Sequence, residues 1–520
     1  MKRQNILVML AESIFFLILL GTIATVHGQK ISYKMTTDIP ASITTPDAVE
    51  TSLGTLRFFD GFPDDATVEK LYDNLDFQRA VQAYLLGLPA VNMAAFRKGL
   101  TQLGPAITTI LTFEDLMDSH TLWLTANNNT PYTWMWLDLH DGPVVMEVPP
   151  SVLGMYNDAW GRYLEDIGFL GPDKGQGGKY LVLPPGYGGE IPEGYLVVKS
   201  PTYGIGLGYR YFAVNGDFKP VMENMKKSAR VYLLSQADNP PANDFSNISG
   251  RVFCTIAPGD SQFWEYLDEV VQVEPTESFD RVSLGYFASI GIEKGKPFAP
   301  DARMQKILAD AAAVSYATAR AVTYRMRNKE NYFYGNSAWR RLFLGGYDFE
   351  TQPGILNLDG YIYFYFLAVG TSPAEEIEIV DKGSQYAIAY VDAAGNPMDG
   401  GKNYILHLPP NIPAKDFWSV VVYDYQTRSW LQTDQQFPSI SSQNKGLIIN
   451  TDGSADVYFG PTAPEGQENN WIQTIPGKGW FAVLRLYGPG KAWFDMTWRP
   501  GEIELMNPGY RKSPDRLDLK

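Results

Sequence analysis

The sequence predicts an α+β protein: an N-terminal domain of mixed helices and antiparallel sheet, followed by a C-terminal β-sandwich or jelly roll. Three patterns lead to this prediction: helical spacing of apolar residues near the N-terminus, alternation of apolar residues in the middle, and short turn-separated apolar runs toward the C-terminus. Apolar residues make up 45% of the 520 residues and charged residues 19%, so a disordered chain is excluded.

The first elements are predicted to be helices, over residues 45–112. Thr45 and Pro46 are typical of a helix start, and a second start is expected at Asp65. From His120 to Asn215 the period changes to two, which predicts strands joined by turns. The resulting division is a signal segment (1–28), an N-terminal α+β domain (45–218), a mixed helical and connecting region (219–382) and a C-terminal β-sandwich (383–505).

Later elements follow the same reasoning. Pro300 and Asp301 predict the start of a helix that runs to about residue 327. From residue 385 onward, spacing and turn residues are typical of a sandwich or jelly roll. The predicted strands are residues 386–391, 402–407, 418–424, 446–450, 456–459 and 480–487.

The first 28 residues have the features of a Sec-type signal peptide. A basic start precedes an apolar stretch that runs to Val26, and a cut is predicted after Gly28. The alternative is an uncleaved anchor, because Ile6 to Val26 is long enough to span a bilayer. We therefore expect a periplasmic or secreted protein, with no membrane contact beyond the signal segment.

Charge and cysteine content exclude several classes of protein. The single cysteine excludes an internal disulfide framework. The net charge of −15 becomes −16 when residues 1–28 are removed, because that segment contains two basic residues and one acidic residue. An acidic chain without a basic patch argues against tight binding of nucleic acids. A small-molecule ligand is the expected partner, and the oligomeric state stays open.

One predicted strand, residues 131–140, has an unusual composition. Alternation places Met135, Leu137 and Leu139 on one face, which we expect to be the core face. The opposite face carries aromatic rings, a carboxylate and an imidazole: Tyr132, Trp134, Trp136, Asp138 and His140. The C-terminal sandwich is expected to cover this aromatic face, because large aromatic patches are rarely left bare.

A hairpin turn is predicted at Asp141-Gly142. Such a hairpin would pair Asp138 with Val145 and Trp136 with Glu147, and would bring Glu147 near Asp138. Two carboxylates and a histidine can bind one divalent metal ion or divide acid and base roles. The predicted catalytic residues are Asp138, His140 and Glu147, of which Asp138 and Glu147 are the predicted metal ligands.

Further polar and aromatic side chains near this strand are predicted to bind substrate: Asn127, Asn129, Tyr132, Trp134, Trp136 and Arg210. Gly204, Gly206 and Gly208 share one face of a strand, which leaves room for a neighbouring backbone, an aromatic ring or a ligand. The alternative to a site is that the aromatic face packs beneath another part of the chain.

Several segments resemble two domains of unknown function. Similar to the exported family with domain of unknown function 1254 are residues 45–51, 56–63, 125–132, 166–173 and 177–186. Similar to its usual C-terminal partner, domain of unknown function 1214, are residues 417–419, 423–424, 450–454 and 470–471. The resemblance implies an N-terminal α+β domain and a jelly-roll sandwich, but no agreed activity. One position departs from the resemblance: Arg210 is followed by Tyr211, where the resemblance leads us to expect glycine.

Three functions are compatible with these observations. The first is a metal-assisted hydrolase or lyase that acts on a small polar or aromatic substrate in a cleft between the domains. The second is a non-catalytic binding module that stacks a sugar or another flat ligand on tyrosine and tryptophan side chains. The third is a phosphodiesterase or nuclease that depends on a divalent metal, because a metal compensates phosphate charge.

Overall fold

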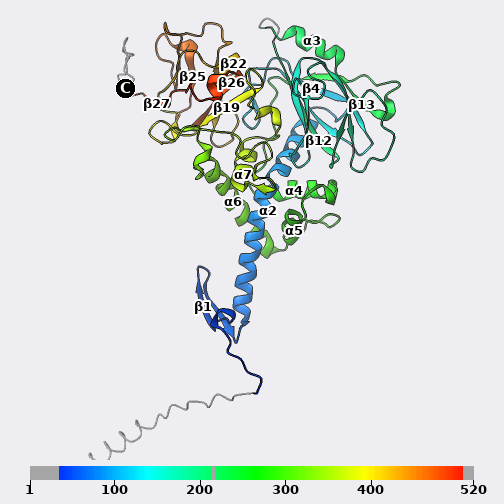
Figure 1. Cartoon of the computed structure of the whole chain (residues 1–520), viewed down its shortest axis with the longest axis vertical. Coiled ribbons are helices and arrows are strands. Elements are labelled where there is room, and N and C mark those ends of the chain that lie inside the picture. Colours follow the sequence, from blue (N-terminus) through cyan, green and yellow to red (C-terminus); the bar gives the residue numbers. More distant parts are fainter. Residues whose placement is uncertain (1–33, 214–216, 377, 507–520) are drawn as a thin grey trace, which may run out of the picture. The chain divides into compact units, whose positions relative to one another are not determined.

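A computed structural model describes residues 34–213, 217–376 and 378–506 (Figure 1). The predicted signal peptide at residues 1–28 lies outside these residues. The chain divides into two compact units, residues 1–72 and residues 73–520. Helices and sheets are mixed, so the predicted α+β class is confirmed.

The first unit contains a small antiparallel sheet where the sequence predicts a helix. Its strands are β1 (Ala48–Thr51), β2 (Gly54–Phe59) and β3 (Phe62–Pro63), after a short 3-10 turn at Ala41–Ile43. The backbone is left-handed at Asp60 (φ 49°) and Gly61 (φ 86°), which is the geometry of a tight hairpin turn. This turn reverses the chain, so the helix predicted from residue 45 is wrong.

Helix α2 (Asp65–Thr101) begins at the predicted second start. Its residues from Ala80 onward are mostly buried within the second unit. There the Tyr84 ring stacks on the Phe263 ring with a centroid distance of 3.7 Å. This buried part of the helix carries Met93 and Phe96, which reappear below.

Two sheets follow α2 in the second unit. A six-stranded sheet has the order β14-β4-β6-β12-β8-β9, and a four-stranded sheet has the order β11-β10-β7-β13. A short pair, β5 (Thr121–Leu122) and β15 (Phe253–Cys254), lies apart from them in the pairing scheme. The bounds are β4 (Thr109–Phe113), β6 (Tyr132–Asp138), β7 (Val144–Val148), β8 (Val152–Asp158), β9 (Tyr163–Gly168), β10 (Gly178–Leu183), β11 (Leu196–Lys199), β12 (Gly204–Tyr211), β13 (Arg230–Leu233) and β14 (Asp244–Asn247), with α3 (Lys219–Ser228) between β12 and β13.

The predicted hairpin between β6 and β7 is wrong. Strand β6 pairs with β4 and β12, whereas β7 pairs with β10 and β13 in the other sheet. Met135 and Leu137 of β6 share a buried cluster with Val144 and Met146 of β7. The chain therefore folds over at Gly142, and the two strands pack through their side chains rather than through backbone hydrogen bonds. The same cluster contains Leu139, so the predicted core face is confirmed.

The middle of the chain is mainly helical. The helix predicted from residue 300 is confirmed as α6 (Ala302–Tyr324), and the Asp301 side chain accepts a hydrogen bond from Met304 N as its N-cap. Among the described residues, no helix is long and apolar enough to cross a membrane. The other elements of this part are α4 (Gln262–Val273), α5 (Arg281–Ser289), α7 (Leu358–Leu367), β16 (Trp339–Arg340), β17 (Glu350–Gln352) and β18 (Ile355–Leu356).

The C-terminal part consists of two further sheets, which Figure 1 shows grouped apart from the two large sheets of residues 109–247. Five of the six predicted strands are present, but residues 446–450 form no strand. One sheet has the order β16-β19-β26-β22-β23, with β20 also on β26, and the other has the order β25-β24-β21-β27. The bounds are β19 (Ser384–Ala389), β20 (Met398–Asp399), β21 (Tyr404–Leu408), β22 (Ala414–Asp424), β23 (Ser439–Ser441), β24 (Ala455–Gly460), β25 (Trp471–Gln473), β26 (Gly479–Pro489), α8 (Lys491–Phe494) and β27 (Ile503–Leu505).

Candidate ligand-binding cavity

The aromatic face of β6 packs on the glycines of β12. In the strand register Gly208 lies opposite Trp134 and Gly206 opposite Trp136. A Cβ atom added at Gly208 would collide with the Trp134 ring, and one added at Gly204 with the Trp136 ring. At Gly206 the nearest side chain is Met93 of α2. The predicted groove along the glycines is therefore filled by side chains, mainly aromatic rings, which are one of the occupants expected from the sequence.

Other rings surround Trp134. Its ring centroid lies 5.6 Å from that of Tyr132 in a stacked arrangement and 5.0 Å from that of Trp123. Phe96 of α2 makes an edge contact with Trp134 at 5.7 Å. These rings form the apolar wall of a cavity.

The cavity lies between strands β6 and β12 of the first six-stranded sheet and the C-terminal strands β19 and β26. Its volume is about 110 Å³. A cavity of about 150 Å³ can bind benzene, so this space is close to the size of one small ring. The lining residues are Met93, Phe96, Met117, Trp123, Leu124, Thr125, Ala126, Asn127, Tyr132, Trp134, Met155, Asn157, Gly206, Arg210, Leu342, Phe364, Ala368, Val369, Gly370, Glu375, Tyr386, Ile388, Val483 and Arg485.

A second, smaller cavity of about 60 Å³ adjoins the first. Both are lined by Tyr132, Trp134, Met155, Arg210 and Glu375. This shared wall places the charged residues Arg210 and Glu375 at the junction, whereas Met93, Phe96 and Trp123 line the first cavity alone. The site thus has an apolar aromatic part and a charged part.

Arg485 of β26 lies in the charged part and is 6% exposed. Its Nη2 donates hydrogen bonds to Thr125 O at 2.6 Å and to Tyr423 Oη at 2.7 Å. Its Nε is buried and has no hydrogen-bond partner among the described residues. A buried guanidinium is thus held in place while one of its donors stays free.

Arg210 of β12 is 8% exposed, and its polar contacts within the described part of the chain are long. Its Nη2 lies 3.8 Å from Glu375 Oε1, and its Nη1 donates to Ser384 Oγ at 3.5 Å. The guanidinium carbon lies 5.7 Å from the centroid of the Tyr132 ring. A guanidinium has five N–H donors, so these contacts leave most of its capacity unused.

Glu375 is the acidic group of the site. Burial raises its pKa to about 7, while Arg210 and Arg485 act in the opposite direction. Asp166 on β9 adds a smaller upward effect. Burial also raises the pKa of Asp166 itself to about 6, although Ser372 Oγ donates a hydrogen bond to it at 2.6 Å. The charge of the site therefore changes near neutral pH.

Several predicted binding residues lie at this cavity. Asn127, Tyr132, Trp134 and Arg210 line it. Trp134 Nε1 is buried without a hydrogen-bond partner among the described residues. Trp136 is buried against Phe96, and the backbone N of Asn129 donates to Asn127 Oδ1 at 2.8 Å.

The predicted catalytic residues lie elsewhere. Asp138 Oδ1 is 2.6 Å from His140 Nδ1, and both side chains are about half exposed at the end of β6. Glu147, on the other sheet, accepts a hydrogen bond from Tyr232 Oη at 2.8 Å and pairs with Lys179 Nζ at 3.1 Å. Among the described residues, no group of three or more His, Cys, Asp or Glu side chains could hold a metal ion.

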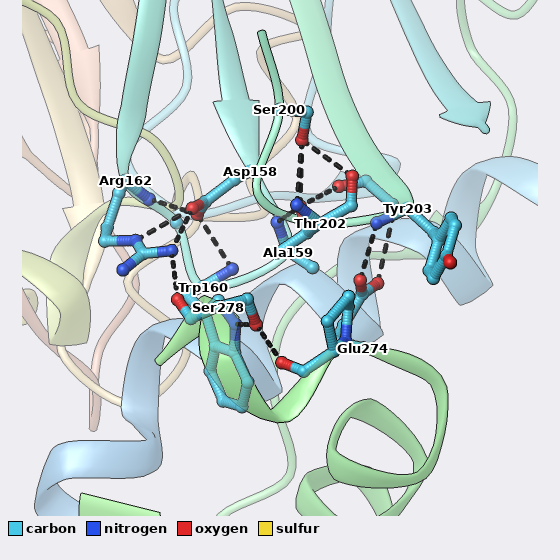
Figure 2. Close-up of polar contacts among 12 residues, drawn as sticks. Asp158, Ala159, Trp160, Arg162, Ser200, Thr202, Tyr203, Glu274 and Ser278 are labelled. Carbon is cyan, nitrogen blue, oxygen red and sulfur yellow. Dashed lines mark hydrogen bonds and ion pairs between the residues drawn. The ribbon is translucent and has the colours of Figure 1, made fainter. Parts of the chain in front are cut away.

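Beside His140 lies a polar network that braces the sheet. The His140 ring stacks on Tyr203 at 4.1 Å, and Glu274 accepts hydrogen bonds from the backbone N atoms of Tyr203 and Gly204. Figure 2 shows this contact next to the pair of Asp158 and Arg162. Asp158 also accepts hydrogen bonds from two backbone N atoms, so its buried oxygens are satisfied. The network connects the C-terminal end of α4 to the starts of strands and serves as scaffold.

Our sequence reasoning missed Arg485, Glu375 and Tyr386. Arg485 had a usable signal, because it is a lone charge inside the apolar run from Trp480 to Tyr487. Charged residues are rarely buried without a role. Glu375 and Tyr386 had no such signal, since long-range packing alone brings them to β12.

Two family models match the chain. Residues 107–233 match the model described as "Protein of unknown function (DUF1254)". Residues 383–491 match the model described as "Protein of unknown function (DUF1214)". These ranges contain β6, β12, β19 and β26, the strands that form much of the cavity wall.

A solved structure shares the fold of this chain. The VPA0106 protein from Vibrio parahaemolyticus is 19% identical, with a TM-score of 0.52 over 83% of this chain and 100% of that chain. An uncharacterized protein from Burkholderia cenocepacia is 11% identical, with a TM-score of 0.37 over 84% and 95% of the two chains. No curated protein matches the sequence. The chain therefore carries a DUF1254 region followed by a DUF1214 region, as its sequence motifs predict.

Proposed function

We propose that this protein binds a small, flat organic molecule in the cavity between β6 and β12 on one side and β19 and β26 on the other. The observation that carries the proposal is a cavity walled by clustered aromatic rings and by a buried arginine whose Nε has no partner. Ligand pockets typically combine such an apolar lining with a few convergent polar groups. This corresponds to the binding module expected from the sequence, with aromatic stacking as the main contact.

Metal-assisted hydrolysis receives less support from the geometry. The expected ligands Asp138 and Glu147 lie on strands of different sheets, and each already has a protein partner. The same separation removes support from a metal-dependent phosphodiesterase. Ligand binding in the cavity does not require Asp138 and Glu147 to lie close together.

A variant that fills the cavity tests the proposal. Val483 lines the cavity, so Val483→Phe should place a ring in it and abolish binding of small aromatic compounds. Binding would be measured by quenching of tryptophan fluorescence and by the shift of the melting temperature. Val197→Phe is the matched control, because Val197 is 37% exposed on β11. Equal binding by the wild type and V483F would refute the proposed site.

We also propose that the protein is exported and that its C-terminal part is a sandwich of the jelly-roll type. The positive start and the apolar stretch of residues 1–28 support export to the periplasm or secretion. The six-stranded and four-stranded C-terminal sheets, rich in antiparallel pairs, support a sandwich of the jelly-roll type.

A further inference from the structure

We propose that the ligand of this cavity carries a single carboxylate, which is bound by Arg485 and Arg210. The inference rests on the proposed function and extends it by naming the ligand class: small aromatic monocarboxylates. It depends on the position, burial and incomplete pairing of the two guanidinium groups.

Arg485 is the first reason. Its hydrogen-bond partners are two backbone carbonyls and a tyrosine hydroxyl, so no carboxylate of the residues that the structure describes neutralises it directly. A charge removed from water is costly unless it is paired. A ligand anion beside the free Nε would supply both the missing acceptor and the missing counter-charge.

Arg210 is the second reason. It continues the face of β12 that carries Gly204, Gly206 and Gly208, because side chains alternate along a strand. The glycines leave space for the tryptophan rings, and the arginine side chain extends to the wall shared by the two cavities. Its long contacts with Glu375 and Ser384 leave donors available for a ligand.

The charges of the site indicate a monoanion. Two guanidinium groups face the cavity, and Glu375 is the one acidic residue of its lining. With Glu375 ionised, a single positive charge remains, and one ligand carboxylate would neutralise it. The planar guanidinium also matches the planar carboxylate in hydrogen-bond geometry.

Cavity size and lining define the rest of the ligand. The cavity of about 110 Å³ and the adjoining cavity of about 60 Å³ together provide slightly more space than the roughly 150 Å³ that holds a benzene molecule. Benzoate and phenylacetate, each one benzene ring with a short carboxylate group, are therefore the ligands to test. The ring of such a compound would contact Trp134 and Phe96, while its carboxylate would reach the arginines. The two ends of the ligand thus match the two parts of the site.

The test compares acids with neutral analogues of the same shape. The full chain would be titrated at pH 7 with benzoate and phenylacetate, and with benzamide and phenylacetamide, by calorimetry. We expect the acids to bind at least about tenfold more tightly. Arg485→Met and Arg210→Met should each abolish this preference while leaving amide binding within about threefold. Arg303→Met, which changes an exposed arginine, should retain the preference.

Arg485 also supports a loop, so R485M can lose stability. Arg485→Lys keeps the positive charge and should retain a reduced preference for the acids. Equal binding of acids and amides to the wild type would overturn the carboxylate inference and leave the proposed function intact. Tighter binding of phenyl phosphate than of benzoate would also overturn it. Absence of binding by all four compounds would count against both proposals.

Discussion

Glu375 sets the charge of the cavity through its ionisation. Burial raises its pKa to about 7, against the opposing influence of Arg210 on β12 and Arg485 on β26, and with Asp166 on β9 acting in the same direction as burial. Below that pH the carboxyl is neutral and no longer competes for Arg210. A carboxylate ligand should therefore bind about threefold to tenfold more tightly at pH 6 than at pH 8.

Calorimetric titrations with benzoate across this pH range would measure the effect. The ligand stays ionised throughout, because an aromatic carboxylic acid loses its proton near pH 4, about where glutamate does. Glu375→Gln should bind with an affinity that no longer changes with pH. A pH dependence that persists in E375Q would assign the titration to another group.

Glu274 gives a second prediction at the residue scale. Its carboxylate accepts hydrogen bonds from the N atoms of Tyr203 and Gly204, at 2.7 and 3.0 Å. Glu274→Ala leaves these donors without their partner and should lower the free energy of unfolding by about 2–4 kcal/mol. Asp138→Ala should cost less than about 1 kcal/mol, because Asp138 is half exposed. Urea denaturation of both variants provides the measurement, and a larger loss for D138A would make Asp138 part of the scaffold.

The raised pKa of Glu274 also makes the stability of the fold depend on pH. Burial raises this pKa from 4.5 to about 7, against the two backbone hydrogen bonds. Between pH 4.5 and about 7, Glu274 is therefore protonated in the folded state but already ionised in the unfolded state. Stability contributed by this group is complete below pH 4.5 and is lost as the pH rises through about 7.

At the scale of an element, strand β12 depends on the close packing of its glycines against neighbouring side chains. A Cβ at Gly208 would overlap the Trp134 ring, so Gly208→Ala should displace that ring and lower stability by about 1–3 kcal/mol. Gly285 within α5 has no atom close to its added Cβ. Gly285→Ala should instead raise stability by about 0.5–1 kcal/mol through better helix propensity. Thermal melts monitored by tryptophan fluorescence would separate the two cases, and equal effects would contradict the packing argument.

Elements with a strong local signal were predictable from the sequence. Alternation in residues 131–140 correctly gave both faces of β6, and Asp301 marked the start of α6. The partner of β7 was not predictable, because the turn at Gly142 is equally compatible with a hairpin and with a fold-over between two sheets. Sequence spacing predicts which side of a strand is apolar, whereas packing decides which strand it pairs with.

The site shows the same division. Tyr132, Trp134 and Arg210 were named because their strand faces could be derived locally. The expected partner Glu147 followed from the wrong strand pairing and lies in a different sheet. Arg485 and Glu375 reach the cavity from segments more than a hundred residues further along the chain, and no local pattern encodes that approach.

For the whole molecule, export is the prediction to test. The mature protein should begin at Gln29, because the sequence predicts a cut site after Gly28, at the end of the apolar stretch. N-terminal sequencing of protein from the periplasm or medium would show this start. A chain that keeps residues 1–28 and sediments with membranes would favour the anchor instead. A cytoplasmic chain that starts at Met1 would refute both alternatives.

The contacts of Arg485 have a consequence for how the two matched regions hold together. Its guanidinium, on β26 in the DUF1214 region, donates to carbonyl oxygens of Thr125 and Ala126 in the DUF1254 region. A ligand between the regions would bind only while they stay docked. By linkage, ligand occupancy would then favour the docked arrangement to the same degree that docking favours the ligand. Binding of one ligand molecule would thus couple the two regions energetically.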